Sequence, residues 1–432
     1  MQKEPFFSVI IPTRERADTL FFCLKSCIAQ SFSDVEFLVS DNFSGDNTRD
    51  VVDSFGDSRI RRVDTGRRVS MRENYEFALL QAVGRYLIII GDDDALIPNG
   101  LAELKAIILS HAVEAVKWAT PVYYWPNYQV ATLAGKLSLT LNDDCAMVDG
   151  RGALNAMRLG LLPFPYMPMI YHGAVSKDLV RRIRAKSGLF FNSDIPDVYS
   201  GIAIAASVKE YLFLAKPVSM HGASSHSSGV AIFNRAMNLD KEGEQADSPV
   251  GKFLREVKEH KHHPDFMPVS EMPAAQTAYT TECLYQVRDA VLGGRLFIPA
   301  WYRLFLMVRE LGRTSGDFMK KVAPLGRYAA RNRLTLLFKL LCRFYFRRHI
   351  KIDEGCLPRW TPSQQRMVFD TQSFGIRDVY AASLVVAQFF QAIPALGRPP
   401  RVSAGTLFIS KSASVLVGWI FRKVYPRGGY MR

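Results

Sequence analysis

The sequence YLIIIGDDD at residues 86–94 places a run of apolar residues directly before three consecutive aspartates. The apolar part, from Tyr86 to Ile90, is short and rich in isoleucine, which is typical of a buried strand in a parallel sheet. The three aspartates follow in the turn at which this strand ends. Because open α/β sheets bind ligands beyond the carboxyl ends of their strands, we expect this turn to lie at a binding site.

Strands and helices alternate around this stretch. The spacing of apolar residues predicts strands at 6–11, 35–40, 60–63, 86–90 and 115–118, and helices at 20–28, 47–52, 71–83 and 101–109. This alternation favours right-handed βαβ units and an α/β fold with an open, mostly parallel sheet, in which 60–63 is an edge strand. Pro12, Thr13, Arg14 and Asp41 then fall at the same edge of the sheet as Asp92-Asp93-Asp94.

The chain divides into four parts. Residues 1–112 form the regular half of the α/β domain described above. Residues 113–230 form a less regular half, with helices near 152–161 and 176–185, and Ser176 caps the second helix. The charged composition of residues 231–276 indicates a linker. From residue 277 to residue 432 the periodicity indicates a mainly helical C-terminal region, with amphipathic runs such as 301–311 and 334–346.

Charge is distributed unevenly between these parts. Residues 291–432 contain 24 lysines and arginines against 6 aspartates and glutamates, whereas residues 1–290 contain 31 against 35. A basic C-terminal region fits an anionic partner, either nucleic acid or anionic lipid headgroups. The apolar stretches 334–346, 383–396 and 406–421 are each interrupted by polar or basic residues, so a spanning helix is an open alternative rather than the expectation.

The six cysteines are scattered, and the N-terminus does not resemble a signal peptide. We therefore expect a cytoplasmic protein.

The aspartate triplet suits group transfer from a nucleotide diphosphate. A hard divalent cation held by carboxylates neutralises the charge of a leaving diphosphate. Asp92 and Asp94 can converge on one cation, Mn²⁺ or Mg²⁺, while Asp93 faces elsewhere. The alternative is a solvated acidic turn that only ends the strand and caps the next helix.

Three further segments support the first interpretation. VIIPTRER at 9–16, EFLVSDNFSGDNT at 36–48, and Asn74 followed by AVGRY at 82–86 all precede the aspartates. Together these motifs resemble family 2 glycosyltransferases with the GT-A fold, closely over residues 1–112 and loosely to residue 230. The resemblance implies an inverting, metal-dependent enzyme that moves a sugar from a nucleotide-sugar donor to a saccharide or lipid-linked acceptor. It makes 1–112 the nucleotide-binding half and 113–230 the acceptor half.

The resemblance also implies roles for individual residues. The nucleotide-binding residues are Pro12, Thr13, Arg14, Arg16, Asp41, Arg72, Asn74, Asp92 and Asp93. The Asp41 carboxylate is expected to accept a hydrogen bond from the base, unless it only forms an Asx turn. Arg14 stands where an aromatic residue is common, so we expect a guanidinium contact in place of stacking on the base. For Arg72 and Asn74, helix packing is the open alternative.

We expect the catalytic base in the segment NSDIPDVYS at residues 192–200. An inverting transferase needs one carboxylate to take the proton of the acceptor hydroxyl. Asp197 best matches the acidic residue that the family has in its acceptor half, and Asp194 is the second candidate. The alternative for Asp197 is a favourable position at a helix N-terminus. Some GT-A enzymes add a late histidine to the metal, which makes His221 a candidate ligand, with His172 and His226 also of interest.

Three competing functions are compatible with parts of the sequence. A Rossmann oxidoreductase requires Gly-x-Gly-x-x-Gly after the first strand, where this chain has Pro12-Thr13-Arg14. A nucleic-acid-binding module would explain the basic C-terminal region, but the chain lacks a recognised motif for it. A scaffold that has lost activity would not need Asp41, Asp92 and Asp94. The favoured hypothesis is a glycosyltransferase of polysaccharide or glycoconjugate synthesis, in peripheral contact with an anionic membrane at the inner face of the plasma membrane.

Overall fold

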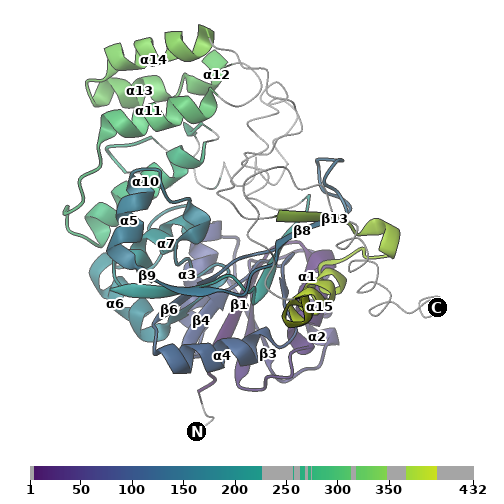
Figure 1. The fold of residues 1–432 in the computed structure, drawn as a ribbon. Helices are drawn as coiled ribbons and strands as arrows, with labels where there is room; N and C mark the ends of the chain where they lie inside the picture. Colours follow the sequence, from purple (N-terminus) through teal and green to yellow (C-terminus); the bar gives the residue numbers. More distant parts are fainter. Residues whose placement is uncertain are drawn as a thin grey trace.

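A computed structural model describes residues 4–225, 256, 263–267, 271–273, 275–312, 318–347 and 366–396. Its α/β part is built on two sheets, and a stack of helices extends from one end of it (Figure 1). The predicted linker at 231–276 is described only at 256, 263–267, 271–273 and 275–276. His226 and the apolar stretch 406–421 lie outside the described residues.

The main sheet is open and mixed, with a parallel core. Its order is β3-β2-β1-β4-β10-β6-β11-β9, with β3 at one edge as predicted. The neighbours among β3, β2, β1 and β4 pair in parallel, as do β6 and β11, whereas β10 and β9 pair antiparallel with their neighbours. The strand bounds are β1 Phe7–Thr13, β2 Val35–Asp41, β3 Ile60–Asp64, β4 Tyr86–Ile89, β6 Ala115–Trp118, β9 Cys145–Asp149, β10 Gly173–Ser176 and β11 Glu210–Leu214.

Helices cover both faces of this sheet. Successive residues of a strand point to opposite faces, so Ile10 and Ile89 enter one core while Ile11 and Ile88 enter the other. Helices α1 and α4 contribute to the second core, and α3, α6 and α7 contribute to the first. The helix bounds are α1 Ala17–Ile28, α2 Thr48–Ser54, α3 Met71–Gln81, α4 Gly100–His111, α5 Gly150–Arg158, α6 Lys177–Ser187 and α7 Pro196–Ala205.

Helices α3, α5 and α6 begin at residues whose side chains satisfy free backbone N–H groups. Ser70 and Glu73 form a reciprocal capping box at the start of α3. Ser176 accepts a hydrogen bond from the N–H of Leu179 at the start of α6, which confirms the predicted cap. Each such cap contributes about 1 kcal/mol. These caps fix where α3 and α6 begin relative to the strands beside the candidate site.

A second, five-stranded sheet has the order β13-β8-β7-β12-β5. Strand β12 pairs antiparallel with β5, and this pairing brings residues near 221 beside the turn at residues 92–94. The strand bounds are β5 Ala95–Leu96, β7 Val122–Tyr124, β8 Lys136–Thr140, β12 Ser219–Ala223 and β13 Arg366–Asp370.

The C-terminal region is mainly helical, as predicted, but it has two destinations. Its first helices, α10 Gln276–Ala290, α11 Ala300–Leu311, α12 Phe318–Val322, α13 Leu325–Arg331 and α14 Thr335–Arg347, stack beyond α5 and α7 (Figure 1). Its later residues return to the α/β part, where β13 extends the second sheet and α15 Val379–Leu396 packs on α1 and β5. Among the described residues, no helix is both long and apolar enough to cross a membrane.

Candidate active site

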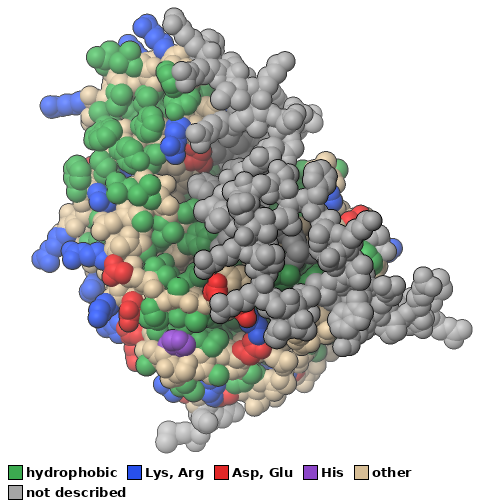
Figure 2. Space-filling model, viewed as in Figure 1, with side chains coloured by type: hydrophobic (Ala, Val, Ile, Leu, Met, Phe, Trp, Pro, Cys, Tyr) green, Lys and Arg blue, Asp and Glu red, His purple; other side chains and the backbone are tan. Residues whose placement is uncertain are grey.

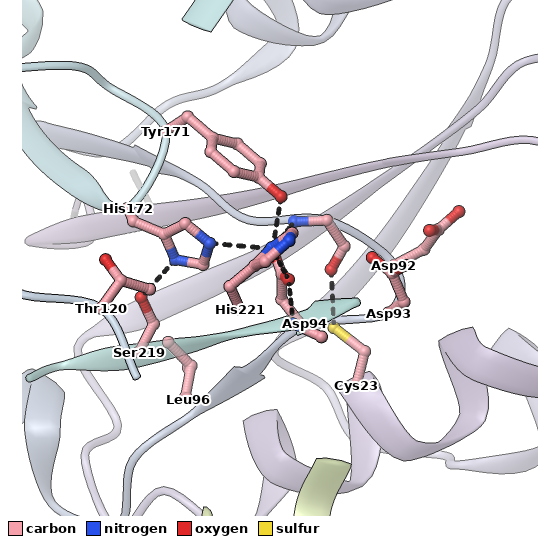
Figure 3. Close-up of polar contacts among 12 residues, drawn as sticks. Cys23, Asp92, Asp93, Asp94, Leu96, Thr120, Tyr171, His172, Ser219 and His221 are labelled. Carbon is pink, nitrogen blue, oxygen red and sulfur yellow. Dashed lines mark hydrogen bonds and ion pairs between the residues drawn. The ribbon is translucent and has the colours of Figure 1, made fainter. Parts of the chain in front are cut away.

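The candidate site is centred on the carboxylate of Asp94, which follows β4 and is completely buried. Tyr171 donates its hydroxyl proton to Oδ2 over 2.7 Å, and the N–H of Gly91 donates to the same oxygen over 2.5 Å. On Oδ1, the N–H of Gly222 donates over 2.8 Å, and Nδ1 of His221 lies 3.1 Å away. The side chain therefore joins three segments that are far apart in the sequence (Figure 3).

Two histidines complete a cluster with ligand geometry. Nε2 of His172 is buried and lies 3.2 Å from Oδ2 of Asp94. The other ring nitrogen of His172 contacts Oγ of Ser219 at 2.8 Å, which fixes the ring orientation. One ligand atom from each of Asp94, His172 and His221 lies within 4.8 Å of the other two. This arrangement can hold a divalent cation.

The donor atoms of this cluster discriminate between the two cations that the sequence suggested. Mg²⁺ strongly prefers oxygen ligands, whereas imidazole nitrogens suit the transition metals. A site with two imidazoles and one carboxylate therefore fits Mn²⁺ better than Mg²⁺. His172 was noticed in the sequence but was not assigned as a ligand, because nothing in its neighbourhood indicated that it would meet Asp94.

Electrostatics support mutual stabilisation within the cluster. Burial alone would raise the pKa of Asp94, but the two histidines hold it well below its usual value. Burial lowers the pKa of His172, and its effect exceeds the opposing effect of Asp94. For His221, the hydrogen bond and charge of Asp94 outweigh burial and raise the pKa. Asp94 is therefore the anionic centre of the cluster, the form that a cation requires.

Asp92 belongs to a different set of contacts. Its carboxylate accepts a hydrogen bond from Oγ1 of Thr13 over 2.7 Å and pairs with Arg16 over 3.0 Å. Figure 3 shows it pointing away from Asp94 and the histidines. Burial raises the pKa of Asp92 to about 6 despite the charge of Arg16. The structure thus groups Asp92 with the predicted nucleotide residues of β1 and α1, and Asp94 with the two histidines.

Asp93 connects the acidic turn to the end of β12. Its carboxylate accepts a hydrogen bond from the Ser224 hydroxyl over 2.6 Å, and its carbonyl oxygen accepts one from the Trp125 ring over 3.1 Å. Gly222 approaches so closely that a Cβ atom there would lie 1.7 Å from the Asp93 carbonyl oxygen. Only glycine fits at this position, and the close approach brings the neighbouring His221 to Asp94.

The remaining predicted nucleotide residues line the same edge of the sheet. Asp41 is buried, accepts a hydrogen bond from the N–H of Ser44 over 3.0 Å and pairs with Arg62 over 3.1 Å. Asn74 is also buried and exchanges hydrogen bonds with Ser40, which packs α3 against β2.

Two arginines and a proline complete this edge. Arg14 pairs with Glu256 over 2.5 Å, and Nε of Arg72 lies 3.6 Å from Oδ1 of Asp194. Pro12 lies in β1, where it is opposite Ser40 of β2. The pair between Arg72 and Asp194 links the nucleotide-binding half to the segment that carries the candidate base.

Asp197 lies in the first turn of α7 and is half-buried. Burial raises its pKa, although backbone N–H groups at the start of the helix act in the opposite direction. The hydroxyl of Tyr75 is also buried, and the charges of Asp197, Asp94 and Asp92 all raise its pKa further. The candidate base and the acidic turn therefore both lie near enough to Tyr75 for their charges to act on its hydroxyl.

Lys117 was not noticed in the sequence. It lies on β6 and is 2% exposed, and its Nζ donates hydrogen bonds to the carbonyl oxygens of His172 over 2.9 Å and Tyr171 over 3.3 Å. His172 has a φ of 51°, an uncommon conformation for a residue with a side chain. The ammonium group holds this turn, and its burial lowers the pKa of Lys117 to about 7. A lysine within an apolar strand is the only sequence signal that would have pointed to it.

Comparison with known proteins identifies a family model and several relatives. Residues 8–144 match the family model described as Glycosyl transferase family 2. The Escherichia coli UDP-Glc:alpha-D-GlcNAc-diphosphoundecaprenol beta-1,3-glucosyltransferase WfaP is 23% identical over 257 residues, which cover 54% of this chain and 92% of that protein.

A second relative and a solved structure were also found. The Campylobacter jejuni GalNAc(5)-diNAcBac-PP-undecaprenol beta-1,3-glucosyltransferase is 35% identical over 103 residues, covering 23% of this chain and 33% of that protein. A crystal structure of S. aureus TarS in complex with UDP-GlcNAc superposes with a TM-score of 0.45 at 14% identity, covering 83% of this chain and 98% of that one.

Proposed function

Because residues 8–144 place this chain in glycosyl transferase family 2, we propose that it transfers a sugar from a nucleotide-diphosphate donor to a saccharide or lipid-linked acceptor. The chain is a glycosyltransferase with a GT-A type α/β fold. The observation that carries the proposal is the cluster of Asp94, His172 and His221 at the end of β4, beside the contacts of Asp92 with Thr13 and Arg16.

The donor would lie across this edge of the sheet. Asp94, His172 and His221 would hold a divalent cation, most suitably Mn²⁺, which when bound neutralises charge on the leaving diphosphate. Thr13 and Arg16 hold the Asp92 carboxylate, which would contact the nucleotide rather than the cation cluster.

The other nucleotide contacts follow the same edge. Asp41 would accept a hydrogen bond from the base, because each carboxylate oxygen retains acceptor capacity beside Ser44 and Arg62. Pro12, Arg14, Arg72, Asn74 and Asp93 complete the proposed nucleotide-binding residues.

Asp197 would act as the base of an inverting displacement. Its carboxylate takes the proton of an acceptor hydroxyl while that oxygen bonds to the anomeric carbon, and the bond from the anomeric carbon to the diphosphate oxygen breaks on the opposite face. A pKa raised by burial makes Asp197 a stronger base than an exposed aspartate. Asp194 is the second candidate, but its ion pair with Arg72 makes it better suited to positioning the loop.

The acceptor is proposed to be lipid-linked. Both glucosyltransferases reported above carry an undecaprenol-linked substrate in their names, and such a substrate is presented at a membrane. We therefore place the enzyme in the cytoplasm, in peripheral contact with the inner face of the plasma membrane, in polysaccharide or glycoconjugate synthesis. The strongly basic C-terminal region supports this location.

A panel of nucleotide sugars with Mn²⁺ tests the proposed function. The donor should raise the melting temperature of the full chain and undergo slow hydrolysis, both dependent on the cation, because a ligand that binds only the folded state stabilises it. His221→Ala should remove both effects, whereas Asp178→Asn, a change at an exposed surface pair on α6, should remove neither. Hydrolysis that persists in excess chelator and in His221→Ala would overturn the assignment of the cation site.

A further inference from the structure

Helix α14 is the outermost helix of the C-terminal stack, with α10 and α11 between it and the α/β part (Figure 1). One side of α14 is fully used in packing. Phe338, Leu341 and Tyr345 contact the main hydrophobic core, and Cys342 is buried beside them. The helix is therefore held in place by its inner face.

The outer face carries an exposed apolar stripe. Leu336 is 73% exposed, Leu340 is 53% exposed and Phe344 is 48% exposed. These residues are spaced four apart and so lie one above the other along the helix. A single exposed leucine needs no explanation, but an aligned row on one helix indicates a surface that meets something apolar.

Basic residues flank this stripe. Lys339 and Arg343 are exposed, and each lies three residues after a leucine of the stripe, on the same outer face. The described segment 318–347 contains no aspartate or glutamate. Its basic residues are Lys320, Lys321, Arg327, Arg331, Arg333, Lys339, Arg343 and Arg347. Figure 2 shows apolar and basic side chains intermixed at this end of the molecule.

We propose that the outer face of α14 docks on an anionic phospholipid bilayer, lying in the plane of the membrane surface. Leu336, Leu340 and Phe344 would enter the boundary between headgroups and acyl chains, while Lys339 and Arg343 reach the phosphates beside it. A nucleic acid would use the positive charges but gain nothing from burying two leucines. The combination of both features on one face therefore selects a membrane.

The proposed function includes peripheral contact with a membrane, and the outer face of α14 would be the surface that makes this contact. Only in this respect does the inference rest on the proposed function. Membrane docking itself needs neither donor nor cation. The stack of α10 and α11 would hold the α/β part above the lipid, so that a lipid-linked acceptor and the transferase share one surface.

Cosedimentation of the full chain with vesicles tests the proposal. Phosphatidylcholine vesicles containing phosphatidylglycerol should pellet the protein, and vesicles of phosphatidylcholine alone should pellet much less, with binding falling as salt rises. Leu336→Glu with Phe344→Glu should reduce binding about tenfold or more, because two charges would enter the apolar boundary. Leu109→Glu, at a leucine that is 58% exposed on α4, is the matched control and should bind as wild type.

A charge-reversal pair separates the two components of the surface. Lys339→Glu with Arg343→Glu should abolish the preference for anionic vesicles, whereas Lys186→Glu with Lys209→Glu, both at exposed positions of the α/β part, should keep most of it.

Three results would overturn the proposal. They are equal binding to both kinds of vesicle, binding unchanged by the α14 substitutions, or loss of binding only in variants whose circular dichroism shows misfolding. Binding of an oligonucleotide that is lost in the charge-reversal pair but kept in Leu336→Glu with Phe344→Glu would identify nucleic acid as the partner instead. Donor hydrolysis in the same variants should stay at the wild-type rate, so failure of docking and failure of transfer are distinguishable.

Discussion

Asp94 and Asp197 are both aspartates that border the same site, but their surroundings differ in kind. Asp94 receives hydrogen bonds from Tyr171, His221 and two backbone N–H groups, and its pKa lies well below the usual value. Asp197 accepts hydrogen bonds from backbone N–H groups at the start of α7, and burial raises its pKa.

This difference separates two chemical roles. A carboxylate kept anionic by several donors suits a cation, whereas a partly desolvated carboxylate with a raised pKa suits proton transfer. Environments that push the pKa values of two acids apart thus distinguish a ligand from a base. The comparison makes predictions that differ for the two residues.

The largest effect is expected from Asp94→Asn. The neutral amide would weaken cation binding and leave His172 and His221 without their anionic partner, so turnover should fall below detection. A position in a turn by itself favours a substitution at little cost to the fold. Because the structure shows a fully buried side chain with several donors, we now also expect a lower melting temperature. Turnover near the wild-type rate would contradict the assignment of Asp94 as a cation ligand.

Asp197→Asn should lower turnover by about two orders of magnitude or more while the donor still binds. The amide cannot take the acceptor's proton, but it occupies the same space at the start of α7. Steady-state transfer and donor binding, measured on the same preparation, separate the two effects. Asp194→Asn is the matched control. If that variant shows the loss and Asp197→Asn does not, the base lies three residues upstream.

The pH dependence of turnover tests the role of Asp197 as the base. A base must be deprotonated, so turnover should fall as the pH drops through the pKa of Asp197. Because burial raises that pKa, the fall should come at a higher pH than for an exposed aspartate. Lys117 lowers the pKa of Asp197 by its charge, so Lys117→Met should move the fall to still higher pH. A profile that is unchanged in Lys117→Met would show that the base is not near this lysine.

The smallest effect is expected on the free energy of unfolding and concerns Glu282 of α10. This buried acid contacts the segment that carries Asp197. Its carboxylate accepts a hydrogen bond from Ser193 over 2.5 Å, and burial raises its pKa from 4.5 to about 7. A raised folded-state pKa means that its contribution to stability is fully present below pH 4.5 and is lost as the pH rises through 7.

Glu282→Gln cannot ionise and should escape that loss. Urea unfolding at pH 8 should show the variant to be more stable than the wild type, by up to about 3 kcal/mol. At pH 5 the difference should shrink. Glu103→Gln, at an exposed pair with Lys216, should show a difference that hardly changes with pH. A Glu282→Gln variant that is less stable at pH 8 than at pH 5, relative to wild type, would contradict the assignment.

The surroundings of Asp94 also show which features of the fold and the site are predictable from the sequence. The alternation of strands and helices and the placement of Asp41 and Asp92-Asp93-Asp94 at one edge of the sheet were predictable, because they depend on local periodicity. The partners of Asp94 were not, since Tyr171 and His172 lie more than 75 residues away from it. Only the antiparallel insertion of β10 beside β4 brings them together.

Other features depend on contacts between still more distant segments. The pairing of β13 with β8 joins residues more than 220 positions apart, and no local pattern marks β13 as a strand of that sheet. Lys117 had no visible role because its partners are backbone carbonyls of another strand end. By contrast, the amphipathic pattern at 334–346 was readable, but only the structure shows which of its apolar residues remain exposed.

The most direct test of the account is calorimetric titration of UDP with Mn²⁺ into the wild type, Asp94→Asn and Asp197→Asn. We assign cation and diphosphate binding to Asp94 and proton transfer to Asp197. We therefore expect Asp197→Asn to bind UDP as the wild type does, and Asp94→Asn to lose the Mn²⁺-dependent part of binding. Retention of Mn²⁺-dependent binding by Asp94→Asn, or its loss in Asp197→Asn, would contradict the account.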